Sequence, residues 1–346
     1  METQKIIRES EFRSEYASVA QSLKRESGSN QILGRSKAVQ ALRGKIDKIS
    51  FCKVNVLISG ESGTGKEIAA RAIHYLSHKA GKPFIPVNCG AIPESLFENE
   101  LFGHMKGAFT DAGLQQIGLV KEAEGGTLFL DEIGVITPYI QAKLLRLLQD
   151  KEYRPVGDSK RHKADVRIIA ATNTDLQSLV EQGTFRKDLF YRLNVVSLHM
   201  PPLKERMEDI PILVEHFINR YSIEYDKPIE GLSKDTMKAF MSYSWPGNIR
   251  ELENNIQQII VMSTTPVIDV EDIYLPISNP SSKGSELEDF NSAKKRIVYS
   301  FAKNYLTQLL TEEGGDVISA ARRAGKSRTG LWNLLKKFNL SPGKFH

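Results

Sequence analysis

The chain has 346 residues and a formal net charge of +5, with 40% apolar and 26% charged residues, the usage of ordinary globular proteins. At about 150 residues per domain, this length predicts two or three domains. No apolar run approaches the roughly 20 residues of a membrane helix, and the charged N-terminus lacks the apolar core of a signal peptide. We therefore expect a cytoplasmic protein with no membrane partner.

The two cysteines, Cys52 and Cys89, are far apart and form no CxxC pair, and the seven histidines show no HExxH spacing. This pattern argues against a disulfide framework and against a structural zinc site. We expect no metal site built from cysteine and histidine, and a reducing compartment fits the composition.

Alternating strand and helix patterns begin after residues 1–30, a polar, helix-prone segment that is too short for a domain. Helical periodicity is present over 67–78 and over the amphipathic stretch 138–149. Apolar runs typical of buried strands lie at 54–59, 84–88, 127–130, 166–171 and 195–200. Strands separated by helices predict an α/β fold, a parallel sheet with helices on both faces.

The second half of the chain has a different pattern. From residue 201 to about 276 it is purely helical, and the Pro-, Ser- and Gly-rich stretch that follows has the composition of a linker. A last helical block runs from about Phe290 to Phe338. We predict a short N-terminal segment 1–30, an α/β domain 31–203, a helical domain 204–275, a linker 276–288 and an all-α domain 289–346.

Positive charge is concentrated at the C-terminal end. Residues 314–346 hold seven basic residues against one acid, Asp316, so the rest of the chain is close to neutral. A short basic end on a near-neutral body indicates contact with a polyanion. The alternative is a basic helix that merely faces solvent.

A glycine-rich loop follows the first strand and opens a helix, the context expected of a phosphate loop. Its glycines let backbone N–H groups surround phosphate oxygens, the helix N-terminus adds positive potential, and Lys66 brings a full charge to the β- and γ-phosphates. Glu67 stands where Ser or Thr usually holds Mg²⁺. The predicted nucleotide-binding residues are Gly60, Glu61, Ser62, Gly63, Thr64, Gly65, Lys66 and Glu67.

The strand that begins at Thr127 ends in two acids, Asp131 and Glu132. Strand ends of parallel sheets line the ligand crevice, so Asp131 can hold Mg²⁺ through water while Glu132 polarises the attacking water as general base. An acidic turn after a strand is common by itself, but behind a phosphate loop it predicts binding and hydrolysis of a nucleotide with Mg²⁺.

With these two elements, the chain closely resembles the AAA+ transcriptional activators of sigma-54 RNA polymerase, the NtrC-type bacterial enhancer-binding proteins. The resemblance covers about Ile32–Leu275 for the ATPase and Phe290–Phe338 for a Fis-type helix-turn-helix. GESGTGKE is the family's usual phosphate loop, including the glutamate at position 67. The other matching segments are residues 87–89, 100–104, 125–132, 171–173, 185–189 and 245–252.

The resemblance implies an AAA+ P-loop parallel sheet with helices on both faces and a helical lid, followed by an all-α helix-turn-helix domain. Asn88 resembles the switch residue that holds Glu132 away until ATP and the partner are in place. Asn173, which follows Thr172, resembles sensor I and is expected to orient the attacking water. Arg250 resembles sensor II, a lid arginine that reports on the γ-phosphate.

Arg186 and Arg192 resemble the family's arginine fingers. A guanidinium inserted across a subunit boundary stabilises charge on the γ-phosphoryl group. Because such fingers act on the ATP of a neighbouring subunit, the resemblance implies a ring, usually a hexamer. The alternative for either arginine is a surface ion pair.

Two loops resemble those with which the family contacts its partner. The first reads Gly107-Ala108-Phe109-Thr110-Asp111-Ala112 where the family carries GAFTGA, so Phe109 and Thr110 match the sigma-54 contacts. Asp111 replaces a glycine that reaches positive φ without a Cβ penalty, and it adds a negative charge. We expect the loop to engage sigma-54 less efficiently; the alternative for Phe109 is packing against its own hairpin. Residues 152–163 resemble the second pore-facing loop.

Residues 315–325 resemble the first helix and turn of a helix-turn-helix, started near Asp316 and turned at Gly325. Ser327 is expected to cap a second helix that ends at about Phe338. The predicted base-reading residues are Arg328, Thr329 and Asn333, and the predicted phosphate contacts are Lys336 and Lys337. With pairing helices over 290–310, dimers would bind inverted repeats of double-stranded DNA; the alternative is a small basic dimerisation bundle.

Together these features predict an ATPase that binds upstream DNA as dimers, assembles into a ring and remodels sigma-54 RNA polymerase for promoter opening. One alternative is an ATP- and DNA-binding regulator or repressor that Asp111 uncouples from sigma-54. Another is an AAA+ remodeller of a different target. Because about 30 residues precede the ATPase and none resembles a receiver domain, we expect control by a separate regulatory protein, by expression level or by a partner subunit; the alternative is constitutive activity.

Overall fold

The computed structural model describes residues 31–108, 114–263, 265–270, 305–306, 309–314 and 316–337. The N-terminal segment 1–30, the predicted loop contacts Phe109–Ala112 and the linker 276–288 lie outside the described residues. The chain divides into two compact units, residues 1–277 and 278–346, and each is described by itself.

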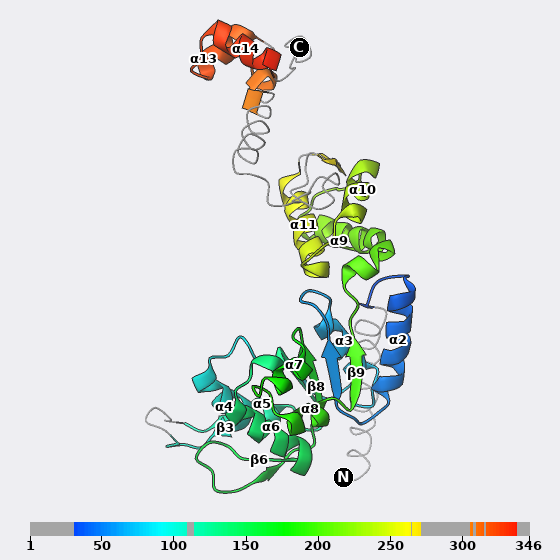
Figure 1. The fold of residues 1–346 in the computed structure, drawn as a ribbon, viewed down its shortest axis with the longest axis vertical. Helices are drawn as coiled ribbons and strands as arrows, with labels where there is room; N and C mark the ends of the chain where they lie inside the picture. Colours follow the sequence, from blue (N-terminus) through cyan, green and yellow to red (C-terminus); the bar gives the residue numbers. More distant parts are fainter. Residues whose placement is uncertain are drawn as a thin grey trace, which may run out of the picture. The chain divides into compact units, whose positions relative to one another are not determined.

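Five parallel strands in the order β2-β5-β8-β1-β9 form the central sheet of the first unit (Figure 1). Asn88 lies opposite Asp131 and Ser59 lies opposite Thr172, so the carboxyl ends of these strands meet at one edge. The predicted parallel sheet is confirmed. Its strands are β1 (Val56–Ser59), β2 (Phe84–Asn88), β5 (Thr127–Asp131), β8 (Arg167–Thr172) and β9 (Val196–His199).

Helices cover both faces of this sheet. Leu128 and Ile168 pack into one apolar core with α4, α6 and α8, whereas their neighbours Phe129 and Ile169 pack into another with α2 and α3. Because alternate residues of one strand face opposite sides, both faces are buried, as the unbroken apolar runs predicted. None of the described helices is long and apolar enough to cross a membrane. The helices are α2 (Lys37–Ser50), α3 (Lys66–Tyr75), α4 (Glu94–Phe102), α5 (Leu119–Glu122), α6 (Pro138–Asp150), α7 (Leu176–Glu181) and α8 (Lys187–Leu193), with a 3₁₀ turn η2 (Ile133–Val135).

A helical lid follows the sheet, with an apolar core of its own around Trp245 and Phe240. The expectation of a purely helical segment is wrong in one detail, because β10 (Gly231–Leu232) and β11 (Val267–Ile268) pair in parallel. Two-residue strands leave no alternating pattern to read. The other elements are the 3₁₀ turns η3 (Leu203–Glu205) and η4 (Met207–Asp209) and the helices α9 (Ile210–Glu224), α10 (Lys234–Ser242) and α11 (Asn248–Met262).

Two short antiparallel hairpins carry the loops singled out by the sequence. The first pairs β3 (Gly103–His104) with β4 (Gln116–Ile117), and the second pairs β6 (Glu152–Tyr153) with β7 (His162–Lys163). The hairpin bases are joined to each other, since Met105 N donates to Val156 O at 3.0 Å and Val156 N donates to Gly103 O at 2.9 Å. The bases of the two loops therefore form one hydrogen-bonded unit.

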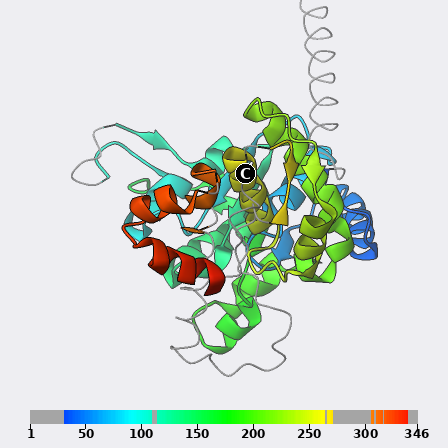
Figure 2. The same cartoon turned by 90° about the horizontal axis from the view of Figure 1, so that it is seen from above.

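The second unit contains α13 (Val317–Arg323) and α14 (Arg328–Lys337), which cross each other (orange to red in Figure 2). As predicted, Asp316 caps the first helix and accepts a hydrogen bond from Ile318 N at 2.9 Å. Gly325 lies in the turn with φ +61°, and Ser327 Oγ accepts from Gly330 N at 3.1 Å. Most of the expected pairing helices, 290–310, lie outside the described residues. The core residues are Leu306, Leu309, Leu310, Ala320, Ala321, Leu331 and Leu335.

Candidate functional site

The phosphate loop connects β1 to α3 and surrounds the amine of Lys66. Gly63 and Gly65 have φ values of +75° and +94°, a conformation that side chains disfavour and that the turn into α3 requires here. Lys66 is buried, and its Nζ donates to the carbonyl oxygens of Gly60 at 2.9 Å and Glu61 at 3.0 Å. Burial lowers the pKa of Lys66, and the neighbouring carboxylate of Asp131 opposes that shift.

The two acids predicted for hydrolysis lie at the end of β5, level with the end of β2. Asp131 Oδ1 accepts a hydrogen bond from Glu132 N at 2.9 Å, and Glu132 has left-handed backbone angles of +56° and +41°. The Glu132 carboxylate lies against Gly90, where an added Cβ would come within 2.3 Å of its Oε2. Asn88 Oδ1 accepts from the N–H groups of Gly90 at 2.8 Å and Ala91 at 3.2 Å. The predicted switch residue and the predicted base therefore converge on one glycine.

The residues predicted as sensor I follow β8 at the same edge of the sheet. Thr172 is buried, its hydroxyl donates to Thr174 O at 2.9 Å, and its carbonyl accepts from Gly60 N at 3.2 Å. Asn173 is exposed directly beyond it. The backbone thus ties the start of the phosphate loop to the strand end that carries Asn173.

Arg186 and Arg192 lie at the two ends of α8, and both are exposed. Arg186 pairs with Asp188, with 2.7 Å between Nη2 and Oδ2, and Arg192 O accepts from Asn55 Nδ2 at 3.0 Å. Within the described part of the chain, no hydrogen bond or ion pair joins either side chain to the phosphate loop. Both guanidinium groups are therefore accessible to another molecule.

The start of lid helix α11 is docked on the tip of the phosphate loop. Ile249 N and Arg250 N donate to Gly63 O at 3.0 and 3.3 Å, and Arg250 Nη1 donates to Ser62 Oγ at 3.3 Å. A Cβ on Gly63 would come within 2.2 Å of Gly247 O. The predicted sensor II is thus placed beside the loop, and a glycine permits the close approach.

Three residues that the sequence interpretation did not assign contact the same loop. Asn248 Nδ2 donates to Glu61 Oε2 and to Ser62 O, both at 3.0 Å, and Lys204 Nζ pairs with Glu61 Oε1 at 3.0 Å. Arg206 is 1% exposed and donates from Nη2 to Thr64 O at 3.2 Å. Its Nε and Nη1 are buried and find no hydrogen-bond partner among the described residues.

A cavity lies between the phosphate loop and the lid, and Arg206 is part of its wall. Its apolar wall suits a planar base, and two unpaired guanidinium nitrogens at a buried position suit the polar or anionic part of a ligand. The carboxylates of Asp131 and Glu132 at the strand end are hard oxygen ligands of the kind that Mg²⁺ prefers. The lining residues are Gln31, Ile32, Leu33, Thr64, Gly65, Ile68, Met200, Arg206, Leu213, His216, Phe217, Arg220, Ile249 and Glu253.

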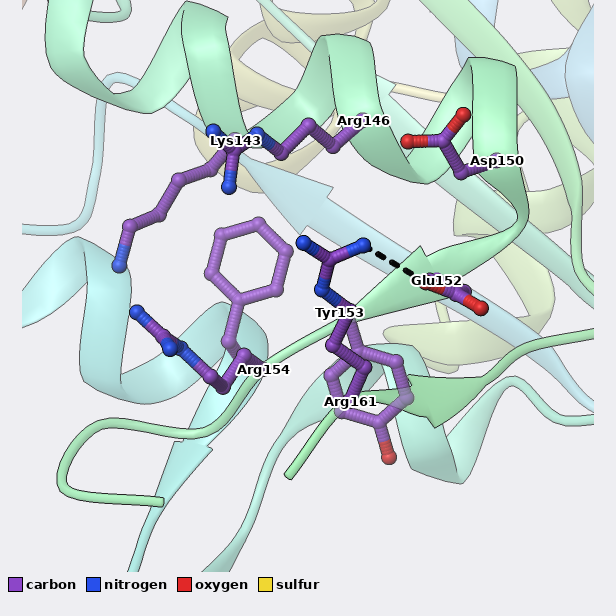
Figure 3. A pocket seen from close by; sticks show the side chains of 8 residues that line it. Lys143, Arg146, Asp150, Glu152, Tyr153, Arg154 and Arg161 are labelled. Atoms are coloured by element: carbon purple, nitrogen blue, oxygen red, sulfur yellow. Dashed lines mark hydrogen bonds and ion pairs between the residues drawn. The ribbon is translucent and has the colours of Figure 1, made fainter. Parts of the chain in front are cut away.

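A second hollow lies at the base of the second loop, and its wall combines basic, acidic and aromatic side chains, most of them from α6 and from the hairpin (Figure 3). Arg161 Nη1 pairs with Glu152 Oε2 at 3.5 Å across the hairpin, and Lys143 pairs with Glu98 of α4. Next to this hairpin, the Cβ of Ala108 lies so close to Gly157 that a side chain there would meet it at 2.7 Å. The second loop is therefore held against the base of the first.

The predicted DNA-contacting residues lie on one side of α14. Leu331 and Leu335 are buried, whereas the side chains on the other turns face solvent. Trp332, which the sequence interpretation did not assign, is 52% exposed on this surface. The side chain of Lys337 lies outside the described ones. The exposed predicted contacts are Arg328, Thr329, Asn333 and Lys336.

Comparison with known proteins agrees with this geometry. Residues 32–199 match the sigma-54 interaction domain family, and residues 204–289 match an AAA+ ATPase lid domain. The regulatory protein AtoC of Escherichia coli is 45% identical over 90% of this chain and 68% of its own length. The chain belongs to the family of sigma-54-dependent transcriptional regulators.

Two further relatives cover nearly the same part of the chain. The transcriptional regulatory protein XylR of Pseudomonas putida is 40% identical over 96% of this chain and 61% of its own length. A crystal structure of NtrX from Brucella abortus in complex with ATP superimposes with a TM-score of 0.68 at 34% identity, covering 89% of this chain and 69% of that one. The resemblance drawn from the motifs is confirmed, and this sigma-54 regulator is an AAA+ P-loop ATPase.

Proposed function

We propose that this sigma-54 regulator hydrolyses ATP in a ring of subunits and uses the resulting movement to remodel sigma-54 RNA polymerase for promoter opening. The observation that carries the proposal is the shared edge of the sheet. Lys66, the two acids after β5 and Asn173 gather there, and a helix connects each of two neighbouring strand ends to a loop hairpin: α4 leads from β2 to β3, and α6 leads from β5 to β6. A change at the nucleotide therefore has a path to the loops through these two helices.

The chemical roles follow from the positions of the side chains. Lys66 would neutralise charge on the β- and γ-phosphates, and Glu132 would take a proton from the attacking water, which Asn173 helps to orient. Asp131 would hold Mg²⁺ through a water molecule, and the bound ion would supply positive charge opposite the leaving phosphate. Asn88 would restrain Glu132 through the Gly90 segment.

The arginine fingers would come from a neighbouring subunit. Arg186 and Arg192 are exposed on α8 and have no hydrogen bond to the described part of their own phosphate loop. An arginine supplied by another subunit stabilises transition-state charge without being fixed in the resting site. This supports a ring, for which we propose a hexamer, and it predicts that turnover rises with protein concentration as the ring assembles.

The first loop, residues 107–112, is the proposed sigma-54 contact. Its family pattern GAFTGA has Asp111 in place of glycine, and this departure favours a second candidate, a DNA-binding ATP-dependent regulator or repressor uncoupled from sigma-54. An assay of ATP-dependent opening of a sigma-54 promoter separates the two. Opening by the wild-type chain supports remodelling. Opening only after Asp111→Gly supports the uncoupled regulator.

Helices α13 and α14 are the proposed reader of upstream double-stranded DNA, a helix-turn-helix in which α14 enters the major groove. Support comes from the capped start of α13, the glycine turn at Gly325 and the basic, solvent-facing side of α14. Binding as a dimer predicts footprints with inverted-repeat symmetry. The proposed contacts are Arg328, Thr329 and Asn333 to bases and Lys336 and Lys337 to phosphates.

A further inference from the structure

Glu61 belongs to the phosphate loop, but its side chain contacts the lid. Oε2 accepts a hydrogen bond from Asn248 Nδ2 at 3.0 Å, and Oε1 pairs with Lys204 Nζ at 3.0 Å. Hydrogen bonds from Asn248 and then from Lys204 lower the pKa of Glu61, so the carboxylate stays charged at neutral pH. A charged carboxylate repels phosphate, so the side chain is better suited to hold a cation and an amide than to bind nucleotide.

Asn248 is fixed in position by its own contacts. It is fully buried, and it adopts φ +55°, a left-handed conformation that asparagine tolerates better than most residues. Its N–H donates to Trp245 O at 2.8 Å, and its Oδ1 accepts from Leu203 N at 2.7 Å. With these groups engaged, the remaining amide Nδ2 is presented to the phosphate loop.

Lys204 lies in η3, between the last strand of the sheet and the first helix of the lid. Any rotation of the lid relative to the sheet passes through this segment. Glu61 therefore joins three parts of the molecule at one carboxylate: the phosphate loop, the connection to the lid at Lys204 and the start of α11 at Asn248.

We propose that Glu61, Lys204 and Asn248 form a latch that keeps the lid on the phosphate loop and limits the rate at which ADP leaves. Glu61 is then a positioning residue and not a phosphate contact. The proposal rests on nucleotide binding at the cavity beside Arg206. Exchange of nucleotide requires the start of α11 to leave the loop, and the latch must open with it.

The side chains of Glu61 and Lys204 are about half exposed, at 46% and 54%. Pairs of this kind stabilise weakly and are screened by salt. We therefore expect a modest but measurable effect on exchange, without loss of folding. The test is the dissociation rate of a fluorescent ADP analogue, mant-ADP, from the full chain.

Glu61→Gln and Lys204→Met are each expected to release mant-ADP about two- to fivefold faster than wild type. The KM for ATP should rise by a similar factor, while kcat at saturating ATP stays within about twofold. The double variant should release no faster than the faster single variant, because both substitutions break the same contact. Added salt should speed release from wild type and leave the double variant nearly unchanged.

Asp235→Asn is the matched control, because it removes one carboxylate and one exposed ion pair, Asp235–Lys238 at 2.8 Å, from the same lid. It should release mant-ADP at the wild-type rate. The latch would be overturned if Glu61→Gln released mant-ADP at the wild-type rate, or if the effects of the two substitutions added in the double variant. A fall in kcat without faster release of mant-ADP would overturn it as well. Failure of the wild-type chain to bind mant-ADP would instead overturn the nucleotide site.

Discussion

The carboxylate of Glu132 rests against the α-carbon of Gly90, so closely that a Cβ at position 90 would lie 2.3 Å from Glu132 Oε2. Real Cβ atoms do not make such contacts, and the carboxylate would have to move. The N–H of the same glycine donates to Asn88 Oδ1 at 2.8 Å. Gly90 therefore links the proposed switch residue to the proposed base, and its lack of a side chain lets Glu132 occupy this position.

Gly90→Ala is expected to displace Glu132 and lower kcat for ATP about tenfold or more, because a misplaced general base loses most of its effect. ATP affinity should change little, since among the described residues no hydrogen bond joins Gly90 to the phosphate loop. Steady-state ATPase and ATP-binding measurements check this. Gly44→Ala is the control, because an added Cβ at Gly44 meets nothing within 4 Å. Equal kcat values for the two variants would contradict the role of Gly90.

Arg206→Met is expected to weaken ATP binding about tenfold, because Nε and Nη1 of this buried side chain have no partner among the described residues and are left for a ligand. The variant also loses the hydrogen bond from Nη2 to Thr64 O and the positive charge near buried Asp209, so the nucleotide-free protein should be less stable by about 1 to 3 kcal/mol. Thermal melts with and without ATP measure both effects. An ATP-induced rise in Tm as large as in wild type would show that Arg206 does not face the ligand.

The burial of His74 predicts that the free energy of unfolding depends on pH. It is fully buried, and burial lowers its pKa from 6.5 to about 4, with Nδ1 at 2.9 Å from Thr127 Oγ1 and Nε2 at 3.1 Å from Lys82 O. The unfolded chain therefore binds a proton more readily than the folded one. The contribution of neutral His74 to the free energy of unfolding is fully present above pH 6.5, and it is lost as the pH falls from 6.5 toward 4.

When the pH is lowered from 7 to 5, the free energy of unfolding of the wild-type chain should fall by about 2 kcal/mol more than that of His74→Gln, whose side chain cannot titrate. Urea unfolding at the two pH values measures the difference between the two proteins. A parallel loss in wild type and variant would mean that His74 is not held neutral by burial.

Trp332 gives an optical test of the DNA-binding surface. The chain has two tryptophans, Trp245 in the lid, 1% exposed, and Trp332 on α14, 52% exposed. Duplex DNA should protect Trp332 from quenching by acrylamide and leave the emission of the variant Trp332→Phe unchanged. Trp332→Ala should weaken binding about five- to tenfold through loss of apolar contact in the groove. Full accessibility of Trp332 in a DNA-saturated sample would place α14 away from DNA.

The sequence located most of the sheet and predicted a phosphate loop after β1 and an acidic pair after β5, which the structure places at the sheet's carboxyl edge. β8 is buried along its whole length, and this leaves an unbroken apolar run whose predicted bounds, 166–171, lie within one residue of the observed Arg167–Thr172. Gly60–Lys66 and Asp131–Glu132 were recognised because their spacing within the chain is itself the signal. The caps at Asp316 and Ser327 were found for the same reason, since a cap is a contact between near neighbours.

The contacts that were missed join residues far apart in the chain. Asn248 lies 187 positions from Glu61, and Arg206 lies 142 from Thr64, so no local pattern marks either pair. The sequence gives no sign of the role of Gly90, because that role depends on the close approach of Glu132, which lies far from it in the chain. The pair β10–β11 was missed because two residues are too few to alternate.

The central claim is that Glu132 activates water for ATP hydrolysis in this sigma-54 regulator. The most direct test is the steady-state ATPase rate of purified Glu132→Gln at saturating ATP and Mg²⁺, with ATP binding measured on the same sample. We predict that binding is retained while turnover falls about 100-fold or more. Turnover equal to that of wild type would contradict it.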